Sequence, residues 1–181
     1  IDGTTNFYHG LPLFAVSIGL AHQGKPILGV VHAPALDECY AARRGGGARL
    51  NDAPIRVSET TGLPDALLSS GFAYSRNRQS YTNLENFQRL LMESREVRRC
   101  GSAALDLCWV ACGRFDGFWE AYLNPWDVAG GICIVQEAGG RVSDFTGGDD
   151  FLMGQNIIAS NGRIHEALRE KLDPFPIDTS P

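Results

Sequence analysis

The first residues of the chain bring a carboxylate, a glycine and two hydroxyl side chains together. Asp2 is followed by Gly3, Thr4 and Thr5. The carboxylate of Asp2 offers hard oxygen ligands of the kind that Mg²⁺ prefers. Gly3 lets the backbone approach a ligand, and if Thr4 opens a helical turn, the two amide groups point at an anion while the Thr4 hydroxyl orients a water molecule. Taken alone, so short a pattern favours a simpler interpretation, a turn that an Asp caps.

Two further acids lie far along the chain. Asp127 follows Pro125 at the start of a predicted helix, where the simpler interpretation is an acid that the helix dipole stabilises. Glu120 stands seven positions before Asp127, at the end of an aromatic stretch that begins at Phe118. Both acids are candidates for a site shared with Asp2.

A third candidate element is the segment Gly101-Ser102-Ala103. It places backbone groups and a hydroxyl at a predicted strand-to-helix turn. Ser102 has the side chain of a typical N-cap, so a purely structural role is the simpler interpretation.

The hydrophobic pattern indicates the elements that must position these residues. Early apolar stretches separated by turn residues predict an antiparallel hairpin, and later stretches alternate between strand and helix. We expect strands at residues 14–21, 26–33, 38–43, 66–70, 97–100, 115–120 and 157–160, and helices at 81–92, 102–112, 126–138 and 164–172. The pattern predicts a layered, mixed α/β protein. We expect residues 1–181 to form a single domain with a polar tail from about residue 173 that frays.

The composition and net charge exclude several classes of protein. The net charge of −5, with only short basic pairs such as Arg98-Arg99, argues against nucleic acid as the main partner. Those pairs indicate solvated charge or a subunit interface. No apolar run is long enough to span a membrane, and the first residues do not resemble a secretory signal. The cysteines predict reduced thiols in a cytoplasmic protein; they are Cys39, Cys100, Cys108, Cys112 and Cys133.

Several ordered segments together resemble the inositol monophosphatase family. The family signature D-P-[IL]-D-G-T-[TK]-N-F is present from its third letter, at Ile1, and the signature W-D-x-A-[AG]-G is complete at residues 126–131. Residues 101–107, 113–118 and 137–144 are also similar to the family, in the same order and at the expected separations. The resemblance extends to about Leu172. It implies an αβαβα sandwich of the sugar-phosphatase type, of which this chain is the C-terminal two-thirds.

The resemblance also implies roles for individual residues. Mg²⁺ would be bound by the carboxylates of Asp2 and Asp127 and by the carbonyl oxygen of Ile1. Thr4 would position the attacking water, and the amides of Gly3 and Thr4 would hold phosphate oxygens. The substrate alcohol would be contacted by Gly101, Ser102, Ala103 and Glu120, with Glu120 accepting hydrogen bonds from ring hydroxyls. In the family, two more acidic metal ligands precede the position of Ile1, so we expect low activity from residues 1–181 alone.

The implied reaction is hydrolysis of myo-inositol monophosphates by metal-activated water, with inhibition by Li⁺ and a homodimeric assembly. The presence of Thr5-Asn6 after the Gly-Thr pair favours the branch of the family that acts on inositol monophosphates. Alternatives that the residues leave open are fructose-1,6-bisphosphatase, histidinol phosphatase or adenosine 3′,5′-bisphosphate phosphatase activity. A fourth alternative is a non-catalytic regulatory relative that binds a protein or RNA complex.

Overall fold

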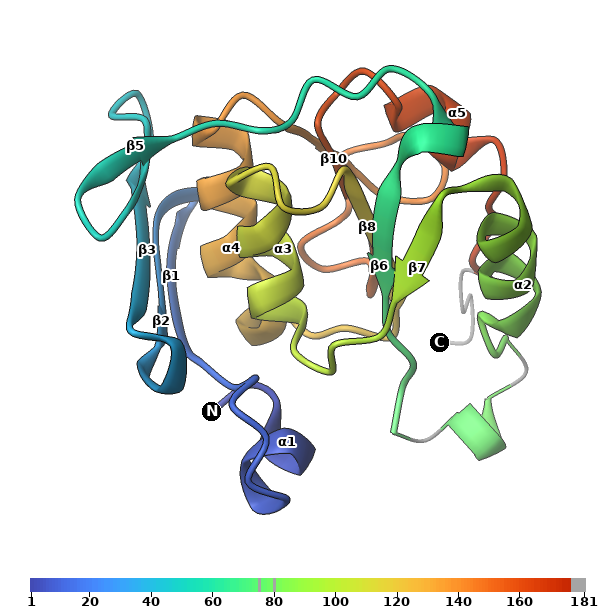
Figure 1. The fold of residues 1–181 in the computed structure, drawn as a ribbon, viewed down its shortest axis with the longest axis horizontal. Coiled ribbons are helices and arrows are strands. Elements are labelled where there is room, and N and C mark those ends of the chain that lie inside the picture. Colours follow the sequence, from blue (N-terminus) through green and yellow to red (C-terminus); the bar gives the residue numbers. More distant parts are fainter. Residues whose placement is uncertain (75, 80, 177–181) are drawn as a thin grey trace.

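The first third of the chain forms one antiparallel sheet. The computed structural model describes residues 1–74, 76–79 and 81–176. The strands of this sheet follow one another in chain order (Figure 1). They are β1 (Val16–His22), β2 (Lys25–Ala33), β3 (Glu38–Arg43), β4 (Ala48–Leu50) and β5 (Ala53–Ile55). The predicted hairpin is confirmed as β1–β2, whereas β4 and β5, of three residues each, were not predicted.

The second sheet is mixed and draws its strands from the rest of the chain. Its order is β7-β6-β8-β10-β9, with β6 parallel to β7 and β8, and β10 antiparallel to β8 and β9. The strands are β6 (Leu67–Ser70), β7 (Glu96–Arg98), β8 (Gly117–Ala121), β9 (Arg141–Ser143) and β10 (Asn156–Ser160). The parallel pairs require crossovers, so helices must cover both faces of this sheet.

The helices form two layers around the second sheet. Those described are α1 (Thr4–Tyr8), α2 (Leu84–Glu93), α3 (Ala103–Ala111), α4 (Pro125–Glu137) and α5 (His165–Arg169), with 3₁₀ turns η1 (Pro34–Leu36), η2 (Leu63–Asp65) and η3 (Arg76–Arg78). Helices α3 and α4 lie between the two sheets, whereas α2 and α5 cover the opposite face of the second sheet (Figure 1).

The layers described are therefore sheet, helix, sheet and helix. They confirm the mixed α+β fold class and correspond to four of the five layers in the implied sandwich. Val16, Ile18 and Leu20 of β1 alternate with Gly19, which contacts α4, so these three side chains lie on the sheet face away from α4 and are exposed.

Helix α4 packs unusually close to the first sheet because glycines meet at the contact. A Cβ on Gly29 would overlap the carbonyl of Gly130, and a Cβ on Gly19 would lie 2.6 Å from the Cβ of Ala129. A Cβ on Gly131, on the side toward α3, would lie 2.5 Å from Leu107. The helix is thus fixed between β1–β2 and α3, which defines the position of its first turn and of Asp127.

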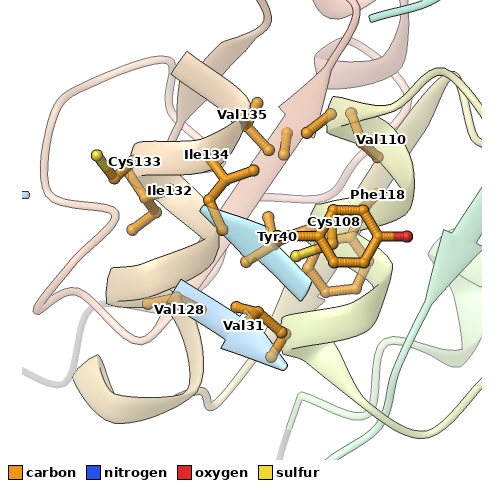
Figure 2. Close-up of a cluster of buried hydrophobic side chains, with 14 of the residues drawn as sticks. Val31, Tyr40, Cys108, Val110, Phe118, Val128, Ile132, Cys133, Ile134 and Val135 are labelled. Carbon is orange, nitrogen blue, oxygen red and sulfur yellow. The ribbon is translucent and has the colours of Figure 1, made fainter. Parts of the chain in front are cut away.

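Two apolar clusters hold the layers together. The larger one joins the first sheet, α3, α4 and the second sheet, and Figure 2 shows Val31 and Tyr40 facing residues of the two helices. The smaller cluster packs α2 and α5 on the second sheet through residues such as Leu90, Leu168 and Trp119. All five cysteines are free thiols. Among the residues described, no helix has the length and apolar character needed to cross a membrane.

Most predicted boundaries differ from the observed ones by one to three residues. The helix expected from residue 81 begins at Leu84, because Asn83 has a left-handed backbone with φ of 62°. Of the predicted tail, residues 177–181 lie outside the described residues. Asp173 forms an ion pair with Arg89, and Phe175 packs edge-on against the ring of Tyr81.

Candidate active site

A cavity of about 400 Å³ opens where the starts of α3 and α4 meet the end of β8. These helix starts lie at the lower side of the view in Figure 1. The volume is within the range that holds small ligands. Of the residues predicted for the site, six line this cavity: Asp2, Gly101, Ser102, Ala103, Glu120 and Asp127. Ile1, Gly3 and Thr4 do not line it directly.

Asp2 is fixed against the N-terminus of α3. Its Oδ2 accepts a hydrogen bond from the Ser102 hydroxyl at 2.6 Å and another from the amide of Ala104 at 2.9 Å. The Ser102 hydroxyl also accepts from the amide of Leu105, so its predicted N-cap role is confirmed. Ser102 therefore both caps helix α3 and orients the carboxylate of Asp2.

Asp127 occupies the first turn of α4. Its Oδ2 accepts a hydrogen bond from the amide of Asn124 at 2.8 Å, so it helps to close the helix N-terminus. Burial raises the pKa of Asp127, and the negative charge of nearby Asp2 adds to this effect. The helix-acid interpretation and the site interpretation are compatible, because the same carboxylate caps the helix and faces the cavity.

Gly3 and Thr4 border the cavity. Gly3 has φ of 80°, and a Cβ there would lie 2.6 Å from the carbonyl oxygen of Leu13 and 3.3 Å from the Cβ of Ser102. Only glycine suits this close approach. Thr4 begins α1, as the sequence suggested, and its Oγ1 lies 3.4 Å from the hydroxyl of Tyr74, a residue of the cavity wall.

The far end of the cavity contains two buried carboxyl groups. Burial raises the pKa of Glu120 to about 8, and the charge of Asp106 adds to it. Burial likewise raises the pKa of Asp106 to about 8. The guanidinium of Arg99 opposes both shifts. Glu120 lies against the backbone of Gly71, where any Cβ would overlap its carboxylate.

Sequence reasoning missed several residues of the cavity wall. Arg99, interpreted as solvated or interfacial charge, lines the cavity, and so does Asp106, one turn after Ser102 in α3. The i, i+4 spacing of Ser102 and Asp106 was a usable signal. Tyr74 and Tyr122 come from segments outside the helices and strands, so no periodic pattern identified them.

The donor set fits Mg²⁺ in kind. Within the described part of the chain, no group of three or more His, Cys, Asp or Glu side chains is arranged to hold a metal ion. Two carboxylates, from Asp2 and Asp127, line the same cavity. Mg²⁺ commonly retains several waters and is held by one or two carboxylates together with substrate phosphate oxygens. These two residues can supply that protein contribution.

Comparison with known proteins decides the family. The sequence model of the inositol monophosphatase family matches residues 1–174 of this chain. The chain belongs to the inositol monophosphatase family. An inositol monophosphatase structure from Anabaena (Nostoc) sp. PCC 7120 has 44% sequence identity and a TM-score of 0.93, with 98% of this chain and 71% of that chain covered.

Two curated relatives of this member of the inositol monophosphatase family have different names. The inositol-1-monophosphatase of Mesorhizobium japonicum is 47% identical over 168 residues, covering 93% of this chain and 63% of the relative. A Pseudomonas aeruginosa protein named Nus factor SuhB is 46% identical over 178 residues, covering 96% and 65%. The chain spans between 61% and 66% of the length of the first three curated relatives.

Proposed function

We propose that the protein is a Mg²⁺-dependent phosphatase that hydrolyses myo-inositol monophosphates to inositol and phosphate. The observation that carries the proposal is the convergence of Asp2 and Asp127, distant in sequence, on one cavity whose other end contains Glu120. The chain belongs to a family that includes a relative named inositol-1-monophosphatase, and this membership supports the proposed reaction.

The phosphate end of the site is built from Asp2, Asp127 and Thr4. Both acids have Oδ2 fixed by backbone amides, which leaves Oδ1 of each to bind a cation. When bound, Mg²⁺ supplies an acidified water and neutralises charge on the phosphoryl group and the leaving oxygen. The Thr4 hydroxyl orients the attacking water, and the amides of Gly3 and Thr4 receive phosphate oxygens. The carbonyl of Ile1 would add a further oxygen ligand.

The alcohol end is built from residues that hold the inositol ring. Glu120 hydrogen-bonds ring hydroxyls, and Gly101, Ser102 and Ala103 form the adjoining wall. Water attacks phosphorus as the bond to the inositol oxygen breaks, and the leaving oxygen takes up the proton that the attacking water loses. The five free thiols suit a reducing compartment, so we place the reaction in the cytoplasm. The proposal that the protein is a homodimer rests on family resemblance alone.

A regulatory role is the second candidate, and one observation favours it. The Pseudomonas aeruginosa relative named Nus factor SuhB is as similar in sequence as the relative named as an enzyme. The intact pair Asp2 and Asp127 favours catalysis, alone or beside such a role.

The test is a substrate panel measured on the protein at its full natural length. Phosphate release from inositol 1-phosphate, fructose 1,6-bisphosphate and adenosine 3′,5′-bisphosphate is compared with Mg²⁺ and with EDTA. We expect inositol 1-phosphate to be preferred, with activity only in Mg²⁺ and inhibition by Li⁺. Preference for either other substrate would change the assigned substrate, and activity in EDTA would contradict the mechanism.

A further inference from the structure

The phenol of Tyr74 lies against the two hydroxyl side chains that begin helix α1. Its oxygen is 3.4 Å from Oγ1 of Thr4 and 3.3 Å from Oγ1 of Thr5, although 70 positions separate Tyr74 from Thr4 in sequence. Thr5 donates to the phenol oxygen, which leaves the phenol proton to point at Thr4. Both contacts are longer than the ~2.8 Å of a compact hydroxyl pair, and contacts of this kind in catalytic sites commonly shorten when substrate binds.

The segment that carries Tyr74 is held against the active-site cavity. It follows strand β6 directly, and a Cβ on Gly71 would lie 2.1 Å from Oε2 of Glu120. The ring of Phe72 packs against that of Phe87 with centroids 5.5 Å apart. Tyr74 therefore reaches α1 from a segment whose preceding residues are fixed, and it lines the same cavity as Glu120.

The Thr4 hydroxyl requires a partner of this kind to keep one orientation. A threonine in a helix divides between two χ1 rotamers, because its hydroxyl can bond a carbonyl one turn earlier. Thr4 is the first residue of α1, so no preceding turn of that helix supplies a carbonyl. Tyr74 supplies a contact that the helix cannot, and it favours the rotamer that points Oγ1 of Thr4 toward the cavity wall.

We propose that Tyr74 is a positioning residue for the attacking water and acts through the Thr4 hydroxyl. The inference rests on the proposed function, in which Thr4 orients that water. By donating to Oγ1 of Thr4, the phenol holds this hydroxyl in one rotamer and leaves the Thr4 proton and one lone pair to the water. Loss of the phenol hydroxyl should therefore lower kcat and leave KM and the Mg²⁺ requirement unchanged.

Tyr74→Phe tests the proposal, because it removes the hydroxyl and keeps the ring. Tyr74 is 71% exposed, so the variant should fold as the unsubstituted protein does. We expect kcat for inositol 1-phosphate to fall about fivefold and KM to change by less than about twofold. In a Thr4→Ala background, Tyr74→Phe should have no further effect, because no hydroxyl remains to be oriented.

Tyr8→Phe is the matched control, since Tyr8 is an exposed tyrosine of α1 that does not line the active-site cavity. It should leave kcat unchanged. Losses of Thr4→Ala and Tyr74→Phe that add independently in the double variant would overturn the proposal. A kcat of Tyr74→Phe equal to that of Tyr8→Phe would overturn it too.

The rotamer of Thr4 can be measured without turnover, which separates failure of this inference from failure of the proposed function. In the full-length protein in EDTA, three-bond NMR couplings to the Thr4 methyl carbon should report one χ1 rotamer, and Tyr8→Phe should give the same couplings. Tyr74→Phe should give couplings averaged over rotamers, which supports the positioning of Thr4 by Tyr74 even if inositol 1-phosphate is not hydrolysed. Equal couplings in all three proteins overturn it even if hydrolysis is as proposed.

Discussion

The two ends of the cavity place carboxyl groups in different surroundings. At the phosphate end, Oδ2 of Asp2 and Oδ2 of Asp127 each accept a hydrogen bond from a backbone amide at a helix N-terminus, and burial raises the pKa of Asp127. At the alcohol end, burial raises the pKa of Glu120 and of Asp106 to about 8, which favours the protonated form. One end is suited to a cation, and the other to neutral hydroxyl groups.

The difference shows that burial, more than position in a helix, defines what a carboxyl group can do, because Asp106 lies in the first turn of α3 just as Asp127 lies in the first turn of α4. A protonated Glu120 donates one hydrogen bond and accepts others, which matches a sugar hydroxyl better than a carboxylate that can only accept. In the proposed reaction, the charge of the site would then be concentrated where the phosphate and Mg²⁺ bind. Substitutions at the two ends should therefore affect different kinetic constants.

Removing the charge of Asp127 should have the largest effect. We expect Asp127→Asn to lower kcat for inositol 1-phosphate about 10³-fold, because an amide can coordinate but cannot neutralise a cation among clustered oxyanions. Steady-state phosphate release from inositol 1-phosphate measures this change in kcat. Asp52→Asn, at an exposed turn, is the matched control. Activity near that of the control would mean that Asp127 only caps α4.

Thr4→Ala should have the next largest effect. In its proposed role the hydroxyl orients water and does not bind the ion, so kcat should fall about 10²-fold while the Mg²⁺ concentration for half-maximal activity stays unchanged. Thr4→Ser, which keeps the hydroxyl, should retain most of the activity. A parallel loss of Mg²⁺ affinity would reassign Thr4 to the metal site.

Glu120 tests the alcohol end through KM. We expect Glu120→Leu to raise KM for inositol 1-phosphate about tenfold and to leave an aryl phosphate without ring hydroxyls nearly unchanged. Glu120→Gln should have a smaller effect, because an amide resembles the protonated acid in both donating and accepting. If Glu120→Gln is as harmful as Glu120→Leu, Glu120 binds substrate in its ionised form.

A separate effect concerns stability at the alcohol end. The pKa of Asp106 is about 8 in the folded chain, against 3.8 for an ordinary Asp. Between these values the folded state binds more protons than the unfolded state, so the free energy of unfolding should fall as pH rises from about 4 to 8. Urea unfolding in EDTA at pH 5 and pH 8 measures this decrease. Asp106→Asn should make this decrease in the free energy of unfolding smaller. If the decrease is as large in the variant as in the unsubstituted protein, Asp106 does not retain its proton.

The sequence predicted local features better than the site as a whole. Ser102 was identified as an N-cap because a hydroxyl before an apolar helix is a local signal, and the hairpin β1–β2 followed from its turn residues. Roles at Asp2 and Asp127 came from family resemblance, and their placement on one cavity depends on the close packing of α4 against β1 and β2.

The wall residues show what a sequence pattern does not contain. Arg99 and Tyr74 reach the cavity through contacts between segments far apart in the chain, and the charge of Arg99 was equally compatible with solvent exposure. Strands β4, β5 and β9 have three residues each and were not predicted, whereas β7, which is equally short, was. Burial of Asp106 is likewise a property of the assembled layers.

A crystal structure of the full-length protein with Mn²⁺ in place of Mg²⁺ tests the shared metal site most directly. Anomalous scattering locates the ion independently of activity. We predict an ion coordinated by carboxylate oxygens of both Asp2 and Asp127, at distances of about 2.1 Å. An ion bound elsewhere, with these two carboxylates making only their hydrogen bonds to α3 and α4, would contradict the proposed phosphatase site.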